Sequence, residues 1–131
     1  MLRKGDSPEV GEGPDMLGAR PGEIHLVDGH ASPGRGMSVA PDWRELPYHR
    51  IPRRFSRYVP DARGRDTRSI WQAGEGPFVD TELTAALRLV VDGPTHGRIE
   101  PSAPMPVPDY QASLAGTRGW WRPIPEDPGT L

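Results

Sequence analysis

Short runs of alternating apolar and polar residues recur along the chain, separated by glycine- and proline-rich stretches. This pattern predicts β-strands joined by turns. The pattern predicts strands at residues 23–27, 37–40 and 67–73, and residues 2–4 are compatible with a brief edge strand but are too short for alternation to decide. Asp28-Gly29 follows the first of these, and it is a dipeptide typical of tight hairpins. We therefore expect small sheets assembled largely from hairpins.

Three stretches have a helical pattern. Residues 108–117 carry proline in their first turn, with Tyr110 and Leu114 spaced to share one face. Residues 42–46 are compatible with a helical turn that begins with an aspartate cap. Residues 81–87 place two leucines four positions apart. We expect a helix there that passes into a strand, while a strand at residues 87–91, which contain two adjacent valines, is the alternative.

The central stretch, residues 92–101, joins two apolar segments. It opens on Asp-Gly-Pro, a strong turn signal, and then alternates as a short strand ended by proline. On that strand His96, Arg98 and Glu100 would share one face, with Ile99 pointing into the core. A titratable imidazole near an acid could form a functional face. The alternative is a structural histidine beside a solvated glutamate.

Composition limits the size of the core. The chain has 131 residues, of which 34% are hydrophobic, and its 16 glycines and 17 prolines make up a quarter of the total. This length fits one domain at residues 1–131, and frequent glycine and proline prevent helix from dominating. We expect a loop-rich α+β domain in which residues 5–22 and 123–131 are mobile.

Charge is nearly balanced overall but segregated locally. The net charge of −2 gives no general case for binding nucleic acid or an anionic membrane. Eight arginines nevertheless lie between Arg44 and Arg68, interleaved with Tyr48, Phe55 and Tyr58. Arginine with aromatics can clamp phosphates, stack on bases or meet an acidic partner, and a solvated loop is the alternative. Nucleic acid is possible on this segment but is not favoured.

The sequence argues against disulfides, thiolate chemistry, metal sites, membrane spans and signal peptides. The chain has no cysteine, so disulfides and thiolate chemistry are excluded. Its four histidines lack the spacing of metal ligands, and we expect no metal site. No apolar run suits a membrane span or a signal peptide, so we expect a cytoplasmic protein that reaches any target cell without a signal peptide.

Three segments together resemble a known family. The first is Gly34-Arg35-Gly36-Met37-Ser38-Val39, a glycine-rich turn into a strand that carries a serine. The second and most specific runs from His96 to Met105, with the pattern His-x-x-Ile-x-Pro-x-x-Pro-Met. The third is Tyr110-Gln111-Ala112-Ser113-Leu114. These segments resemble type VI secretion effector toxins with an ADP-ribosyltransferase-like fold.

The resemblance implies a fold and a set of site residues. The fold is a split, bent pair of small β-sheets, with few short helices and long loops, whose cleft holds NAD⁺. By resemblance, Arg3 would bind phosphate or ribose from the first strand, and Gly36 would belong to the same cofactor site. Ser38 would support the nicotinamide ribose, and His96 would hydrogen-bond the substrate. The family does not require an acid at Glu100, which is therefore either a catalytic carboxylate or polar surface.

The resemblance also implies a function. We expect an NAD-dependent ADP-ribosyltransferase-like antibacterial toxin that acts in the cytoplasm and is neutralised by a cognate immunity protein, with an unknown acceptor. An NAD⁺ glycohydrolase on the same fold and a non-catalytic partner-binding module are the alternatives. The geometric requirement is that Ser38 and His96 face one cleft, since opposite sides of the domain would rule out the site.

Overall fold

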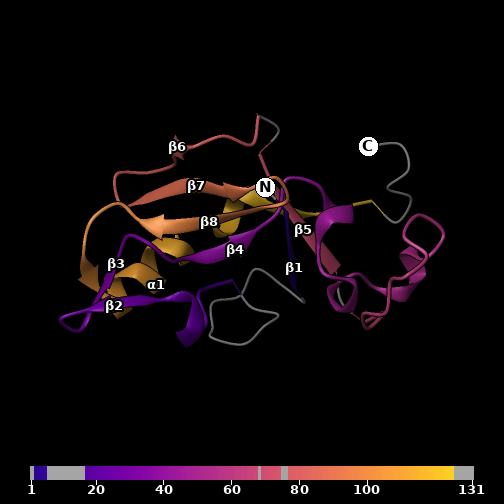
Figure 1. Ribbon diagram of the computed structural model, residues 1–131, viewed down its shortest axis with the longest axis horizontal. Helices are drawn as coiled ribbons and strands as arrows, with labels where there is room; N and C mark the ends of the chain where they lie inside the picture. The colour runs from indigo at the N-terminus through magenta and orange to yellow at the C-terminus, as the bar shows by residue number, and fades with distance from the viewer. Residues whose placement is uncertain (1, 6–16, 68, 75–76, 126–131) are drawn as a thin grey trace.

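The computed structural model describes residues 2–5, 17–67, 69–74 and 77–125 (Figure 1). Within them the chain forms ten strands, one α-helix and five 3₁₀ turns. The strands are β1 (Leu2–Gly5), β2 (His25–Val27), β3 (His30–Ser32), β4 (Met37–Val39), β5 (Ser69–Ala73), β6 (Thr81–Glu82), β7 (Leu87–Gly93), β8 (His96–Pro101), β9 (Met105–Pro106) and β10 (Trp121–Pro123). The helices are α1 (Val107–Ala115) and the 3₁₀ turns η1 (Pro21–Glu23), η2 (Trp43–Glu45), η3 (Tyr48–Arg50), η4 (Arg53–Phe55) and η5 (Arg118–Trp120).

The strands form three small antiparallel sheets, ordered β1-β5-β10, β2-β3-β9 and β4-β8-β7-β6. The α+β class predicted from the sequence is confirmed, although three sheets are present where a pair was expected. The predicted strands at 2–4, 23–27, 37–40 and 67–73 correspond to β1, β2, β4 and β5. Each boundary differs by at most two residues, because strand ends depend on pairing as well as on pattern.

The sheet β4-β8-β7-β6 carries the central stretch. Strands β7 and β8 form the predicted hairpin, in which Asp92 and Gly93 end β7, Pro94 and Thr95 make the turn, and the register is irregular between Val91 and Gly93. Leu89 and Ile99 are directly paired, and both are buried in the core. Alternation then places Arg98 and Glu100 on the opposite face. This second face is polar, and it carries the candidate site.

The helix expected at residues 81–87 is absent, and this prediction was wrong. The segment instead forms β6 and a tight loop into β7 (Figure 1). The Thr84 hydroxyl oxygen accepts hydrogen bonds from the backbone N–H groups of Ala86 and Leu87, each at 3.1 Å. The leucine spacing fits a helix, but Leu87 and Leu89 are both buried at the period of a strand. Cross-strand pairing with β8 decides between the two patterns.

The other predicted local features are present. Asp28 and Gly29 have φ values of 51° and 78°, as a primed hairpin turn between β2 and β3 requires. Helix α1 begins with a proline in its first turn and buries Tyr110 and Leu114 on one face. The predicted turn at 42–46 forms as η2, where the Asp42 carboxylate accepts a hydrogen bond from the backbone N–H of Arg44.

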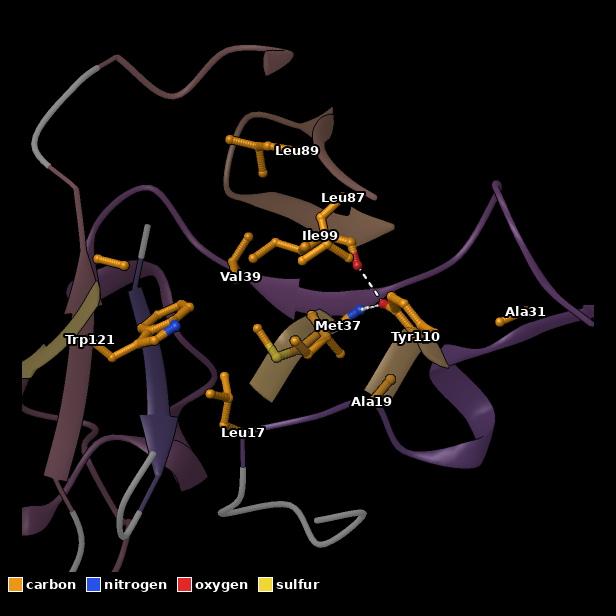
Figure 2. Close-up of a cluster of buried hydrophobic side chains, with 12 residues drawn as sticks. Leu17, Ala19, Ala31, Met37, Val39, Leu87, Leu89, Ile99, Tyr110 and Trp121 are labelled. Carbon is orange, nitrogen blue, oxygen red and sulfur yellow. Dashed lines mark hydrogen bonds between the residues drawn. The ribbon is translucent and has the colours of Figure 1, made fainter. Parts of the chain in front are cut away.

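The main core lies between the β4-β8-β7-β6 sheet and α1, and the Tyr110 hydroxyl joins them (Figure 2). The backbone N–H of Met37 donates to the Tyr110 oxygen at 3.1 Å, and the hydroxyl donates to the Ile99 carbonyl at 2.5 Å. Met37 and Ile99 are register partners on β4 and β8. The phenol therefore bridges the two strands at this point of the ladder.

A second core forms beneath the arginine-rich segment, which carries η2, η3 and η4. Trp43, Phe55 and Ile51 are buried in it, and it joins the β1-β5-β10 sheet through Ile70. The guanidinium groups of Arg44, Arg54 and Arg57 lie over the rings of the adjacent Trp43, Phe55 and Tyr58. The aromatic residues thus give the segment a core of its own, while both the binding role of its arginines and the alternative of a solvated surface stay predictions.

The two segments expected to be mobile lie largely outside the described residues. Where the structure does describe them, several residues are packed. Leu17 and Ala19 are buried in the main core, and Ile124 is buried in the second. The backbone of Pro123 pairs with Trp71 on β5. Apolar residues at the inner ends of both segments thus belong to the folded domain.

The tyrosine bridge leads to a stability prediction. The substitution Tyr110→Phe keeps the ring but leaves the Met37 N–H and the Ile99 carbonyl without this buried partner. We expect the free energy of unfolding, measured by urea denaturation, to fall by about 2 kcal/mol. Tyr48→Phe is the matched control because that side chain is exposed, and it should change little. Equal effects of the two substitutions would contradict a structural role for the bridge.

Candidate functional site

Ser38 and His96 line one cleft on the polar face of the β4-β8-β7-β6 sheet. Ser38 is the register partner of Arg98 on β8, and His96 lies two residues before Arg98 on that strand, so all three side chains share a face. The cleft has two adjoining hollows of about 290 and 170 Å³, and Ser38 and His96 line both. The His96 side chain is 48% exposed, so it is not sealed in the core. The structure thus meets the geometric requirement for these two residues.

Glu23 lies between the two hollows and was missed by sequence reasoning. One of its carboxylate oxygens accepts a hydrogen bond from the backbone N–H of Ser38 at 2.8 Å. The other accepts from the backbone N–H and the side chain of Arg20, at 3.0 and 3.4 Å. Glu23 therefore satisfies the outer edge of β4 and adds a nearly buried carboxylate, 8% exposed, beside Ser38.

Asp92 and Arg98 hold His96 in place. The Nδ1 atom of His96 lies 2.5 Å from Oδ1 of Asp92, and the Arg98 guanidinium donates to the other Asp92 oxygen at 3.0 Å. Partial burial raises the pKa of Asp92, but hydrogen bonds from His96 and Arg98, with their charges, outweigh it and bring the pKa below its ordinary value. Asp92 is therefore a carboxylate at neutral pH and can only accept hydrogen bonds.

Glu100 lies outside the cleft that contains Ser38 and His96. Its side chain is fully buried, with one oxygen 2.6 Å from Nε of Arg98 and the other 2.8 Å from an Arg88 nitrogen. Partial burial lowers the pKa of Arg98, but its hydrogen bonds to Glu100 and Asp92 outweigh this and raise the pKa. The reading of Glu100 as polar surface is wrong, because two arginines neutralise it inside the fold. Its proposed catalytic role stays a prediction.

Position 36 requires glycine because the backbone of β8 passes too close to leave room for a side chain. A Cβ built on Gly36 would lie 2.2 Å from the Ile99 carbonyl oxygen and 2.9 Å from Cα of Glu100. No side chain can occupy that space, because the neighbouring atoms belong to the backbone of β8. Gly36 also lines the smaller hollow, so its expected place in the cofactor site stays a prediction.

Arg3 lies on β1, where its backbone pairs with Trp71 of β5. The side chain of Arg3 lies outside the described part of the structure, and its expected role in binding the cofactor stays a prediction. Strand β1 approaches β4, the strand that carries Ser38.

Arginines surround the cleft and outnumber its acids. Four arginines line the two hollows, Arg20, Arg35, Arg50 and Arg98, against the three carboxylates of Glu23, Glu45 and Asp92. A lining that mixes arginines and carboxylates suits a ligand that carries both anionic groups and hydroxyls. Across the described ranges, no group of three histidine, aspartate or glutamate residues is placed to hold a metal ion. No helix there is long and apolar enough to cross a membrane.

Sequence reasoning missed two residues of the cleft, Asp92 and Glu23, and only the contact of Asp92 could have been predicted from the sequence. Asp92 lies four positions before His96 across a predicted turn, so a contact between the two was foreseeable. Glu23 reaches Ser38 through the tertiary fold alone, and no local pattern marks it.

No family model, curated protein or solved structure matches the chain.

The buried glutamate leads to a second prediction. Glu100→Gln removes the charge that pairs with Arg88 and Arg98, while it keeps the size of the side chain. Because both arginines retain some contact with solvent, we expect a loss of about 2 kcal/mol in the free energy of unfolding, below the range for fully buried pairs. Glu82→Gln, at an exposed position, is the control. Unchanged stability of Glu100→Gln would show that the pairing contributes nothing net.

Proposed function

We propose that this protein is an NAD-dependent ADP-ribosyltransferase-like toxin that acts in the cytoplasm of a target bacterium and is neutralised by a cognate immunity protein. The observation that carries the proposal is the shared cleft of Ser38 and His96, which lie in separate family-like segments. Glu23 adds a carboxylate beside Ser38 in the same cleft.

The cleft offers groups that match the chemistry of a dinucleotide. Arginine side chains such as Arg20 and Arg50 can pair with phosphates, and Ser38 and His96 can hydrogen-bond ribose hydroxyls. The larger hollow, about 290 Å³, lies at the lower end of the range for small-molecule sites. It suits the nicotinamide–ribose half, while the rest of the dinucleotide would lie along the outer rim.

The protein's own residues need to supply few interactions for this reaction. NAD⁺ supplies the leaving group, a positively charged nicotinamide bonded to the ribose. The Glu23 carboxylate is suited to stabilise positive charge that develops on the sugar, because it is nearly buried and held from two sides. Ser38, on a strand fixed at both edges, is suited to orient the ribose.

Turnover of NAD⁺ tests the proposal directly. Purified protein should release nicotinamide, and Ser38→Ala and His96→Ala should each lower the rate by a hundredfold or more, equivalent to about 3 kcal/mol of barrier. Ser56→Ala and His30→Ala remove the same groups from exposed positions outside the cleft, and they should stay active. Expression in bacteria should stop growth for the active proteins only. A folded wild-type protein that neither consumes NAD⁺ nor slows growth would refute the proposal.

The arginine-rich segment is the proposed contact for the immunity protein. Residues 42–66 hold seven arginines against four acids, a balance of +3, whereas the whole chain has a net charge of −2. Arg53, Arg57 and Arg63 are exposed on this segment. The segment's tryptophan and phenylalanine are buried in its own core, which leaves the exposed arginine charges, with Tyr48 beside them, for recognition. An acidic protein surface is the partner that this favours.

Salt dependence tests that contact. With poly-L-glutamate as the probe, affinity should fall as ionic strength rises through about 0.15 M, where screening reaches about 8 Å. The double substitution Arg53→Glu and Arg57→Glu should weaken binding at least tenfold at low salt. Arg118→Glu, on η5 outside this segment, is the control. Tighter binding to a single-stranded oligonucleotide than to polyglutamate would instead indicate a nucleic-acid surface.

A further inference from the structure

We propose that Asp92 is a positioning residue that makes His96 a general base, and that the acceptor of ADP-ribose is an uncharged oxygen nucleophile, either water or a hydroxyl group. This inference rests on the proposed function and identifies the class of its second substrate. It follows from the hydrogen bonds around His96 and from the charges that line the cleft.

The first step is the order of hydrogen bonds along the polar face. Buried Glu100 fixes Arg98 at 2.6 Å, Arg98 fixes Asp92 at 3.0 Å, and Asp92 contacts Nδ1 of His96 at 2.5 Å. The chain of contacts begins at a fully buried carboxylate and ends at the cleft. The imidazole is therefore held by groups anchored in the fold, although nearly half of its surface is exposed.

The second step concerns the protons of the ring. An ionised Asp92 has no proton to donate, so Nδ1 must carry the hydrogen in this contact. In the neutral imidazole, Nε2 is then left with a lone pair and acts as an acceptor. The cleft-lining histidine is thus prepared to accept a proton from a ligand.

The third step concerns the charge of the acceptor. The four arginines that line the hollows are balanced by the three carboxylates there and by buried Glu100, which pairs with Arg98. A cationic acceptor such as an arginine side chain therefore finds no net negative charge to attract it, whereas water or a hydroxyl group needs none. A neutral O–H group also brings the proton that Nε2 can take.

The reaction balances with these groups. The acceptor oxygen bonds to the anomeric carbon of the ribose as the bond from that carbon to the nicotinamide nitrogen breaks. The bonding electron pair leaves with nicotinamide, and the acceptor's proton passes to Nε2 of His96. The resulting imidazolium is stabilised by Asp92, whose carboxylate already lies against Nδ1.

The test combines a structural readout with turnover. Nitrogen-15 NMR of the histidine ring should show the Nδ1–H tautomer of neutral His96 in the wild type, and a shift towards Nε2–H in Asp92→Asn. Nicotinamide release by Asp92→Asn should fall about a hundredfold, with partial rescue in Asp92→Glu. Asp61→Asn, an exposed aspartate outside the cleft, should match the wild type in both measurements. Urea unfolding checks that each variant is folded.

The outcomes separate this inference from the proposed function. An Nε2–H tautomer in the wild type, or full turnover by folded Asp92→Asn, would overturn the role of Asp92. If the wild type shows the Nδ1–H tautomer but releases no nicotinamide, the proposed function and this use of the dyad both fail, while the positioning contact stands. Mass spectrometry of the product should find free ADP-ribose or ADP-ribose attached to oxygen. Attachment to a guanidinium would overturn the acceptor class.

Discussion

The Tyr110 hydroxyl is the interaction on which the arrangement of the cleft depends. It accepts from Met37 on β4 and donates to Ile99 on β8, so one side chain of α1 sets the register at which the two strands meet (Figure 2). Ser38 is next to Met37, and His96 lies three residues before Ile99. The positions of both candidate residues therefore follow from a buried phenol on the face of the sheet opposite to theirs.

Two further constraints maintain this geometry. Gly36 allows the chain before β4 to contact the backbone of β8, where any side chain would collide with the Ile99 carbonyl. Glu23 satisfies the Ser38 N–H at the outer edge of β4, where the described part of the chain adds no further strand to this sheet. Strand β4 is thus fixed at one edge by β8 and at the other by a carboxylate. That carboxylate then also belongs to the cleft.

The chain has few apolar residues, and this explains why charged side chains cover one sheet face and the arginine-rich segment. One face of the β4-β8-β7-β6 sheet is covered by α1, whereas the other is filled by the network of Arg88, Glu100, Arg98 and Asp92. In the arginine-rich segment the aromatic residues form a small core and the arginine charges are left near the surface. Both regions use paired or stacked guanidinium groups where a larger protein would have more buried hydrocarbon.

The sequence by itself determined the features that depend on near neighbours. The Asp28-Gly29 hairpin, the Asp42 cap, the proline-led helix α1 and the β7–β8 turn are all present, because their backbone geometry is set within a few residues. The same local rules placed His96, Arg98 and Glu100 on one face of a strand, since side chains alternate along any strand.

Tertiary structure alone decided the rest. Residues 81–87 follow the pairing of β6 with β7, and of β7 with β8, and not their helical leucine spacing, because a strand buried on one face gains more than a short helix would. Burial of Glu100 depends on arginines from two strands, and the contact of Glu23 with Ser38 depends on how η1 packs beside β4. The contacts of Arg88 with Glu100 and of Glu23 with Ser38 join residues 12 and 15 positions apart. Their energies appear only once the chain is compact, so no local pattern can encode them.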